Sequence, residues 1–262
     1  MSKLWDRMWL VPTVVRLTSR APKDPATAWE GYWRKIHTTG RSGDVLWDSG
    51  SPTEQTRYSD AVLAHFDPDL PVIDVGCGNG TYTRWLADLF PRVLGIDVSP
   101  GAVELAKRQS AGVPNAEFMV LDAAAADAGQ HLLERLGPVN VFVRGVFHIL
   151  KPDQQSGLAA TLRSVIGSSG RVFLLETNFR GSSLAYMQHL GATPHSMPRQ
   201  LQSALENLPR PGHFGAQERH SIFSESDWRV IEDGPANIEV VLMNSGGLSQ
   251  QVPGYFAVLA GV

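Results

Sequence analysis

The chain has little of three things: cysteine, lysine and long apolar runs. Its 262 residues include one cysteine, which excludes a disulfide framework and a cysteine-based zinc cluster and favours a reducing, cytoplasmic setting. No apolar run approaches the roughly 18 residues that a membrane span needs. Lysine and arginine form no run and the net charge is −3, which argues against nucleic acid as a partner.

The first 22 residues, MSKLWDRMWLVPTVVRLTSRAP, have the basic start of a targeting peptide but not the rest of one. Pro12 and Arg16 interrupt the apolar residues, and no small-residue cleavage site follows. We expect a short amphipathic helix that packs on the body of the protein or over its functional site.

Between residues 58 and about 178, apolar runs of strand length alternate with segments of helical period. This order is typical of a parallel sheet with helices on both faces. Ser99 followed by Pro100 is a good helix start, with a capping side chain and proline in the first turn. We expect strands at 72–75, 93–96, 117–120, 139–144 and 171–176, and helices at 81–90, 100–109 and 153–166.

After residue 177 this rhythm stops. Residues 178–221 are rich in proline, glycine and histidine but keep a periodic apolar set, which predicts a lid or pocket wall with helices at 183–190 and 199–208. A helix at 224–231 and two strands at 237–243 and 254–259, paired as an antiparallel hairpin at the sheet edge, complete the chain. We therefore expect an N-terminal helical extension or cap (1–57) and one main domain (58–262) that contains the lid segment (178–221).

The glycine turn in VIDVGCGNG, residues 72–80, should bring the backbone close to a ligand. No lysine follows the glycines, so a P-loop is excluded, and the spacing differs from the G-x-G-x-x-G of dinucleotide sites. The pattern is D-x-G-x-G-x-G, and a carboxylate at Asp74 opposes a pyrophosphate and favours a cationic group such as an ammonium.

Two further acids follow at predicted strand ends. Asp97 comes about 20 residues after the glycine turn, where an acid binds ribose hydroxyls in nucleoside sites. Asp122 ends the next strand and could receive the amino group of an adenine. An acid for an ammonium, one for a ribose and one for an exocyclic amine together fit S-adenosylmethionine.

The segments VIDVGCGNG, VLGIDVSP, FMVLDAAA and VFVRGVFHIL resemble the successive sheet motifs of the class I S-adenosylmethionine-dependent methyltransferases. The resemblance implies an α/β fold, a Rossmann-like, doubly wound, seven-stranded sheet that is mostly parallel with an antiparallel last strand. It also implies S-adenosylmethionine as methyl donor. The cofactor-binding residues that it implies are Asp74, Gly76, Cys77, Gly78, Asn79, Gly80, Asp97, Val98, Asp122, Ala123 and Arg144. Cys77 itself is interpreted as a small apolar residue of the turn.

The stretch WEGYWRKIHTTGRSGDVLWD, residues 29–48, is similar in layout to the small-molecule branch of that family, which includes thiopurine and halide or thiol methyltransferases. Its residues Tyr32, Trp33, His37 and Trp47 could close over the cofactor, or they could bury the aromatic face of an amphipathic helix. In the lid segment, Tyr186, His195, His213 and Phe214 are the candidates for contact with a substrate.

Methyl transfer is an in-line displacement that needs alignment and exclusion of water, and a base only when the acceptor holds its proton firmly. His148 and Glu176 follow the fourth and fifth predicted strands, and we expect these two residues to be catalytic. The alternatives are a buried histidine that caps backbone and a buried, paired acid. The histidines of the lid segment match no metal-ligand spacing, so we expect no metal.

The sequence therefore predicts an enzyme that methylates a small molecule, with a hydroxyl or phenol of a specialised metabolite favoured as acceptor. Arginine outnumbers lysine, 18 to 5, and alanine and glycine are abundant, which is typical of high-GC bacteria. Two alternatives stay open: a cofactor-binding homologue with non-methylating chemistry such as cyclisation or decarboxylation, and a non-catalytic partner subunit. The substrate, the accepting atom and the oligomeric state, a homodimer included, are not determined.

Overall fold

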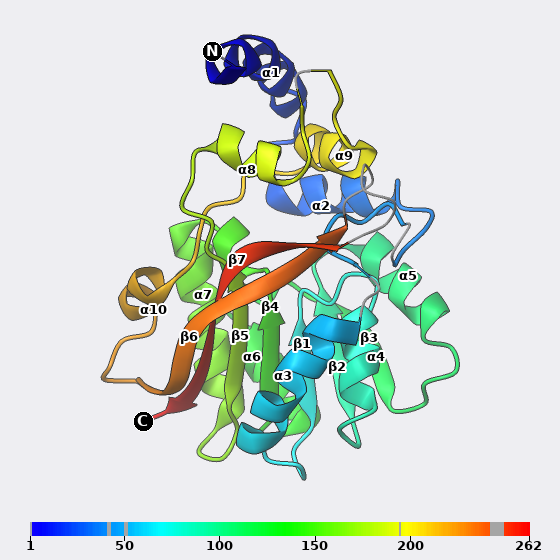
Figure 1. Cartoon of the computed structure of the whole chain (residues 1–262). Helices are drawn as coiled ribbons and strands as arrows, with labels where there is room; N and C mark the ends of the chain where they lie inside the picture. The colour runs from blue at the N-terminus through cyan, green and yellow to red at the C-terminus, as the bar shows by residue number, and fades with distance from the viewer. Residues whose placement is uncertain (1, 41–42, 50–51, 194, 242–248) are drawn as a thin grey trace.

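The computed structural model describes residues 2–40, 43–49, 52–193, 195–241 and 249–262. Seven strands form one sheet in the order β3-β2-β1-β4-β5-β7-β6 (Figure 1). β1 to β5 are parallel, and β7 runs antiparallel to both of its neighbours, which confirms the predicted Rossmann-like sheet. Their bounds are β1 Val72–Val75, β2 Val93–Asp97, β3 Ala116–Val120, β4 Asn140–Arg144, β5 Val172–Thr177, β6 Trp228–Val241 and β7 Ser249–Gly261.

Helices cover both faces of the sheet. On one face, α6 (Ala128–Leu136) and α7 (Pro152–Ile166) pack on side chains such as Ile73 and Val141. On the other, α3 (Pro52–His65) and α4 (Thr81–Ala87) pack on the alternate set, including Val72 and Phe142. Burial on both faces explains why these strands read as continuous apolar runs in the sequence.

The helix expected at residues 100–109 is α5 (Pro100–Gln109), which lies beside β2 and β3. Ser99 is its N-cap and its hydroxyl accepts a hydrogen bond from the backbone N–H of Ala102 at 3.1 Å. The helix begins where its capping residue and Pro100 predict.

Four features of the chain differ from the sequence prediction. α3 and α6 were not expected, and α3 runs across the proposed boundary between residues 57 and 58. The helix expected at 224–231 is wrong, because β6 begins at Trp228 and the preceding helix, α10, spans Ala216–Ile222. β6 and β7 are also longer than expected, since they pair from Trp228↔Gly261 to Val241↔Ser249 and that pairing outweighs local preference. Residue 243, the expected end of one strand, lies outside the described residues.

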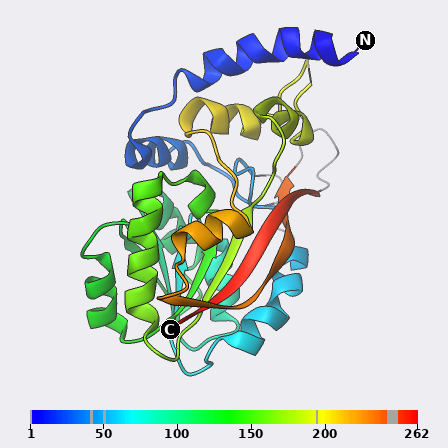
Figure 2. The same cartoon turned by 90° about the vertical axis from the view of Figure 1, so that its left-hand side faces the viewer.

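The N-terminal helices and the lid segment cover one end of the sheet (Figures 1 and 2). α1 (Ser2–Thr18) packs on α8 (Ser183–His189) and α9 (Arg199–Asn207), and α2 (Pro25–Trp33) packs on α5 and α9. In Figure 2 α1 lies across the top of the molecule, above these helices. No helix in the described part of the chain is long and apolar enough to cross a membrane.

Candidate functional site

The glycine turn between β1 and α4 is packed so closely by neighbouring side chains that it has no room for a Cβ. Gly76 and Gly78 have φ values of 72° and 53°, which disfavour any residue with a Cβ. A Cβ at Gly76 would lie 2.6 Å from Val146, and one at Gly78 would lie 2.7 Å from the ring of Trp33 in α2. The turn is fixed by the backbone N–H groups of Gly76 and Cys77, which donate to the carbonyl of Ile96 at 2.8 and 3.0 Å.

Asp97 lies at the end of β2 and holds this turn. One of its carboxylate oxygens accepts the backbone N–H of Gly78 at 2.9 Å, and the other accepts that of Ser99 at 2.9 Å. The residue is 8% exposed, and burial raises the pKa of its carboxyl to about 6 although the two N–H groups oppose the shift. A buried acid that lines the cavity at this position suits the hydroxyl donors of a ribose.

Asp74 belongs to a small recess beside the turn, lined also by Asp48, Asn79 and Arg144 and enclosing about 50 Å³. The hydroxyl of Thr83 donates to Asp74 at 2.5 Å, and burial raises the pKa of the Asp74 carboxyl to about 7. Asp48, 5% exposed, accepts the amide of Asn79 at 2.8 Å. Asp48 was not among the site residues expected from the sequence, although it ends the stretch at residues 29–48 that resembles the small-molecule branch.

Arg144, at the end of β4, lines both the recess and the larger cavity beside it. Its guanidinium pairs with Glu54 of α3 at 2.5 and 3.1 Å and lies 4.6 Å above the centre of the Tyr82 ring. Burial alone would lower the pKa of Arg144, but the adjacent Glu54 carboxylate outweighs it and the pKa is raised. Glu54 had no local sequence signal, since its partner is 90 residues away.

The larger cavity, about 550 Å³, extends from the carboxyl ends of β1 and β2 to the lid segment. Val98, Asp122 and Ala123 line it together with Gly76 and Asp97. Asp122 is held by its own turn, since its carboxylate accepts the backbone N–H of Ala124 at 2.9 Å. Cys77, Gly78 and Asn79 line the recess instead, and Gly80 begins α4 outside both linings.

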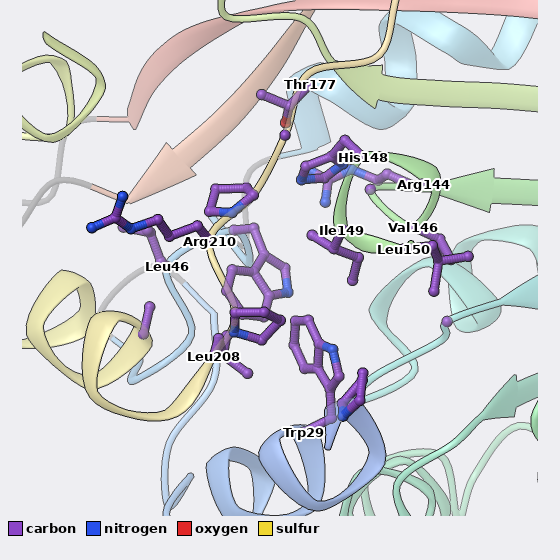
Figure 3. A pocket seen from close by; sticks show the side chains of 18 of the residues that line it. Trp29, Leu46, Arg144, Val146, His148, Ile149, Leu150, Thr177, Leu208 and Arg210 are labelled. Carbon is purple, nitrogen blue, oxygen red and sulfur yellow. The ribbon is translucent and has the colours of Figure 1, made fainter. Parts of the chain in front are cut away.

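His148 lies in the short helix Phe147–Ile149 after β4 and lines the larger cavity (Figure 3). Its Nδ1 lies 2.7 Å from a carboxylate oxygen of Glu176. Glu176 is fully buried at the end of β5 and also accepts the backbone N–H groups of Val146 and Phe147 at 2.9 Å each. The structure brings the two expected residues together, with His148 at the cavity wall and Glu176 behind it.

The eight substrate candidates divide into two groups. Trp33, Trp47, Tyr186 and His213 line the larger cavity. The other four, Tyr32, His37, His195 and Phe214, do not. Tyr32 packs among Trp29, Trp33 and Trp47, and Phe214 packs against Phe147 and Tyr255, so both rings are fully buried. His37 and His195 are exposed. Among the described residues no group of three side chains could hold a metal ion.

The donor set fits an S-adenosyl nucleoside better than a phosphate. Asp74 lines the recess, Asp97 and Asp122 line the larger cavity, and the glycine turn lies between these acids with no room for a Cβ at Gly76 or Gly78. Such a constellation at the carboxyl ends of parallel strands is the usual position for a ligand in this kind of sheet.

Comparisons with known proteins agree with this geometry. The family model described as a methyltransferase domain matches residues 72–170. The crystal structure of an S-adenosylmethionine-dependent methyltransferase from Anabaena variabilis is 27% identical and has a TM-score of 0.77, over 92% of this chain and 98% of that one. A structure described as concerning the conversion of a disulfide bond into a thioacetal group during echinomycin biosynthesis is 20% identical and has a TM-score of 0.64, over 100% of this chain and 93% of that one.

Among curated proteins, the malonyl-[acyl-carrier protein] O-methyltransferase of Acetivibrio thermocellus is 37% identical over 82 residues, 29% of each chain. This match spans less than a third of that relative's length. With the sheet order, the glycine turn and the strand-end acids, these findings show that residues 72–170 match a methyltransferase domain and that the chain has the fold of the class I S-adenosylmethionine-dependent methyltransferases.

Proposed function

We propose that this protein transfers a methyl group to a hydroxyl or phenol oxygen of a small molecule, with His148 as the base. The observation that carries the proposal is the position of the His148 ring, which lines the same cavity as Gly76, Asp97 and Asp122. When bound, S-adenosylmethionine supplies an electrophilic methyl group. The glycine turn and the three acids would hold the cofactor, and His148 would take the proton of the acceptor.

Glu176 would act through His148 and not on the acceptor. Its carboxylate lies 2.7 Å from Nδ1 of the imidazole, so Nδ1 carries the proton and Nε2 is left as the acceptor. Because Glu176 is fully buried and fixed by three backbone N–H groups, it can orient the ring without moving. It is a positioning residue, because its carboxylate holds the ring that would accept the proton.

The cavity supports a small-molecule acceptor. A volume of about 550 Å³ is typical of ligand pockets, and covering helices from both the N-terminal segment and the lid segment would keep water from the reacting atoms. A base favours an oxygen acceptor, since alcohols and phenols hold their proton more firmly than thiols do. A sulfur acceptor, which the echinomycin-related fold match suggests, would depend less on His148.

The first test is calorimetric titration of the protein with S-adenosylmethionine and S-adenosylhomocysteine, with NADH as control. Binding of the first two alone supports the cofactor site. Acceptor panels of phenols and thiols, read by the mass gain of one methyl group, then test the reaction. Binding of the cofactor with no S-adenosylhomocysteine formed from any acceptor would favour the non-methylating alternative, and no binding would favour a partner subunit.

The role of His148 is tested with His148→Gln, which removes the base but keeps a polar side chain. We expect kcat with a phenol to fall about 10²- to 10⁴-fold while cofactor affinity stays unchanged. His220→Gln is the matched control, because His220 is exposed, pairs with Glu225 and does not line the cavity. A His148→Gln variant with wild-type kcat on phenols would refute the assignment.

A further inference from the structure

Many apolar side chains line the lid end of the larger cavity. Its wall there comes from α1, α8 and α9, with Val14, Tyr186, Met187, Leu190, Leu201 and Leu205 among the lining residues. Side chains of this kind favour an apolar acceptor body, because each one gains by removal from water. Recognition of the acceptor must therefore come from the few polar groups in the wall.

One charged side chain in that wall, Arg210, differs from the rest. Arg210 is exposed, and it makes no hydrogen bond or ion pair with any residue that the structure describes. Every other charged side chain that lines the cavity has a partner. These pairs are Asp24 with Thr27, Asp97 with Gly78, Asp122 with Ala124, Arg144 with Glu54, His148 with Glu176 and His213 with Glu218.

The segment that carries Arg210 is fixed to the proposed base. Arg210 lies between Pro209 and Pro211, and both prolines restrict the backbone. The backbone N–H of Gly212 donates to the carbonyl of His148 at 2.7 Å. Two residues extend at most about 7 Å, so the backbone of Arg210 stays within that reach of this hydrogen bond. In Figure 3, Arg210 and Leu46 lie on one side of the lining and His148 and Arg144 on the other, and the guanidinium of Arg210 points away from His148.

We propose that the acceptor is an apolar molecule that carries a carboxylate, which Arg210 binds while the hydroxyl faces His148. The planar guanidinium matches a carboxylate with two parallel hydrogen bonds. One unpaired cation neutralises one negative charge, whereas a phosphate carries nearly two at neutral pH and would leave excess negative charge in a cavity that Asp24 also lines. This inference rests on the proposed function, since it assigns the acceptor of that same cavity.

The test compares the binding of 6-hydroxy-2-naphthoate and its methyl ester to protein saturated with S-adenosylhomocysteine, measured by calorimetry. We expect the carboxylate to bind at least about tenfold more tightly in the wild type, as expected for a charged hydrogen bond. Arg210→Gln should reduce that ratio to near one, and Arg210→Lys should keep part of it. Arg199→Gln is the control, because Arg199 is exposed, pairs with Asp44 and does not line the cavity.

Equal affinities for the two probes in the wild type, or binding of neither, would overturn the inference. A preference that survives Arg210→Gln would also overturn it, because the carboxylate would then be bound elsewhere. The experiment measures binding without turnover. A carboxylate preference that depends on Arg210 would therefore support this inference even if no acceptor were methylated, and only the proposed reaction would then fail.

Discussion

Replacing Asp97 with asparagine should change stability and cofactor binding in opposite directions. Asp97 is 8% exposed, and burial raises the pKa of its carboxyl to about 6 from an ordinary 3.8. This difference means that keeping the group ionised in the folded protein costs about 3 kcal/mol. Asparagine has nearly the same shape and no charge, so it resembles the protonated acid.

The direction with pH follows from the raised pKa. The favourable contribution of this group is fully present below pH 3.8 and is lost as pH rises through about 6. At pH 8 the Asp97→Asn variant should therefore have a higher free energy of unfolding than the wild type, but by less than about 3 kcal/mol, because the amide nitrogen of asparagine cannot accept one of the two backbone N–H groups that Asp97 binds. Under the proposal that Asp97 binds the ribose, cofactor affinity should fall by about 1.5–3 kcal/mol, because the ribose hydroxyls would lose a charged acceptor.

Urea unfolding at pH 5 and pH 8 measures the first effect, and calorimetry with S-adenosylhomocysteine at pH 8 measures the second. Asp127→Asn is the control, because Asp127 is exposed and its side chain makes no capping hydrogen bond at the start of α6. Its unfolding free energy should stay within about 0.5 kcal/mol of the wild type. A variant that is less stable than wild type at pH 8 and binds the cofactor normally would refute both steps of the reasoning.

Two other substitutions test the framework around the cofactor site. Gly78→Ala should weaken cofactor binding and lower the unfolding free energy by about 1–3 kcal/mol, because φ is 53° and the new Cβ would meet Trp33 at 2.7 Å. Gly112→Ala is the control and should not change binding, because the space around Gly112 is open. Glu54→Gln should lower the unfolding free energy by about 3–5 kcal/mol in urea titrations, since Arg144 would stay buried without a counter-charge. Near-wild-type stability for Glu54→Gln would show that the pair is not needed to hold β4 against α3.

Much of the fold could be predicted because its signals are local. The apolar run Val72–Val75, the glycines that follow it and the capping Ser99 each act within a few residues, and all appear where the sequence places them. The antiparallel pairing of β6 and β7 was predicted, but both strands are longer than the sequence predicted. The pairing from Trp228↔Gly261 joins distant segments, and no local pattern states where such a pairing ends.

The candidate site divides in the same way. The sequence by itself determined the glycine turn and the acids Asp74, Asp97 and Asp122, because β-strand alternation and parallel pairing bring strand ends to one edge of the sheet. Only the tertiary structure decided that Glu54 neutralises Arg144 across 90 residues and that Glu176 lies behind His148. Such contacts depend on how helices and loops pack in three dimensions, and that packing leaves no periodic signal along the chain.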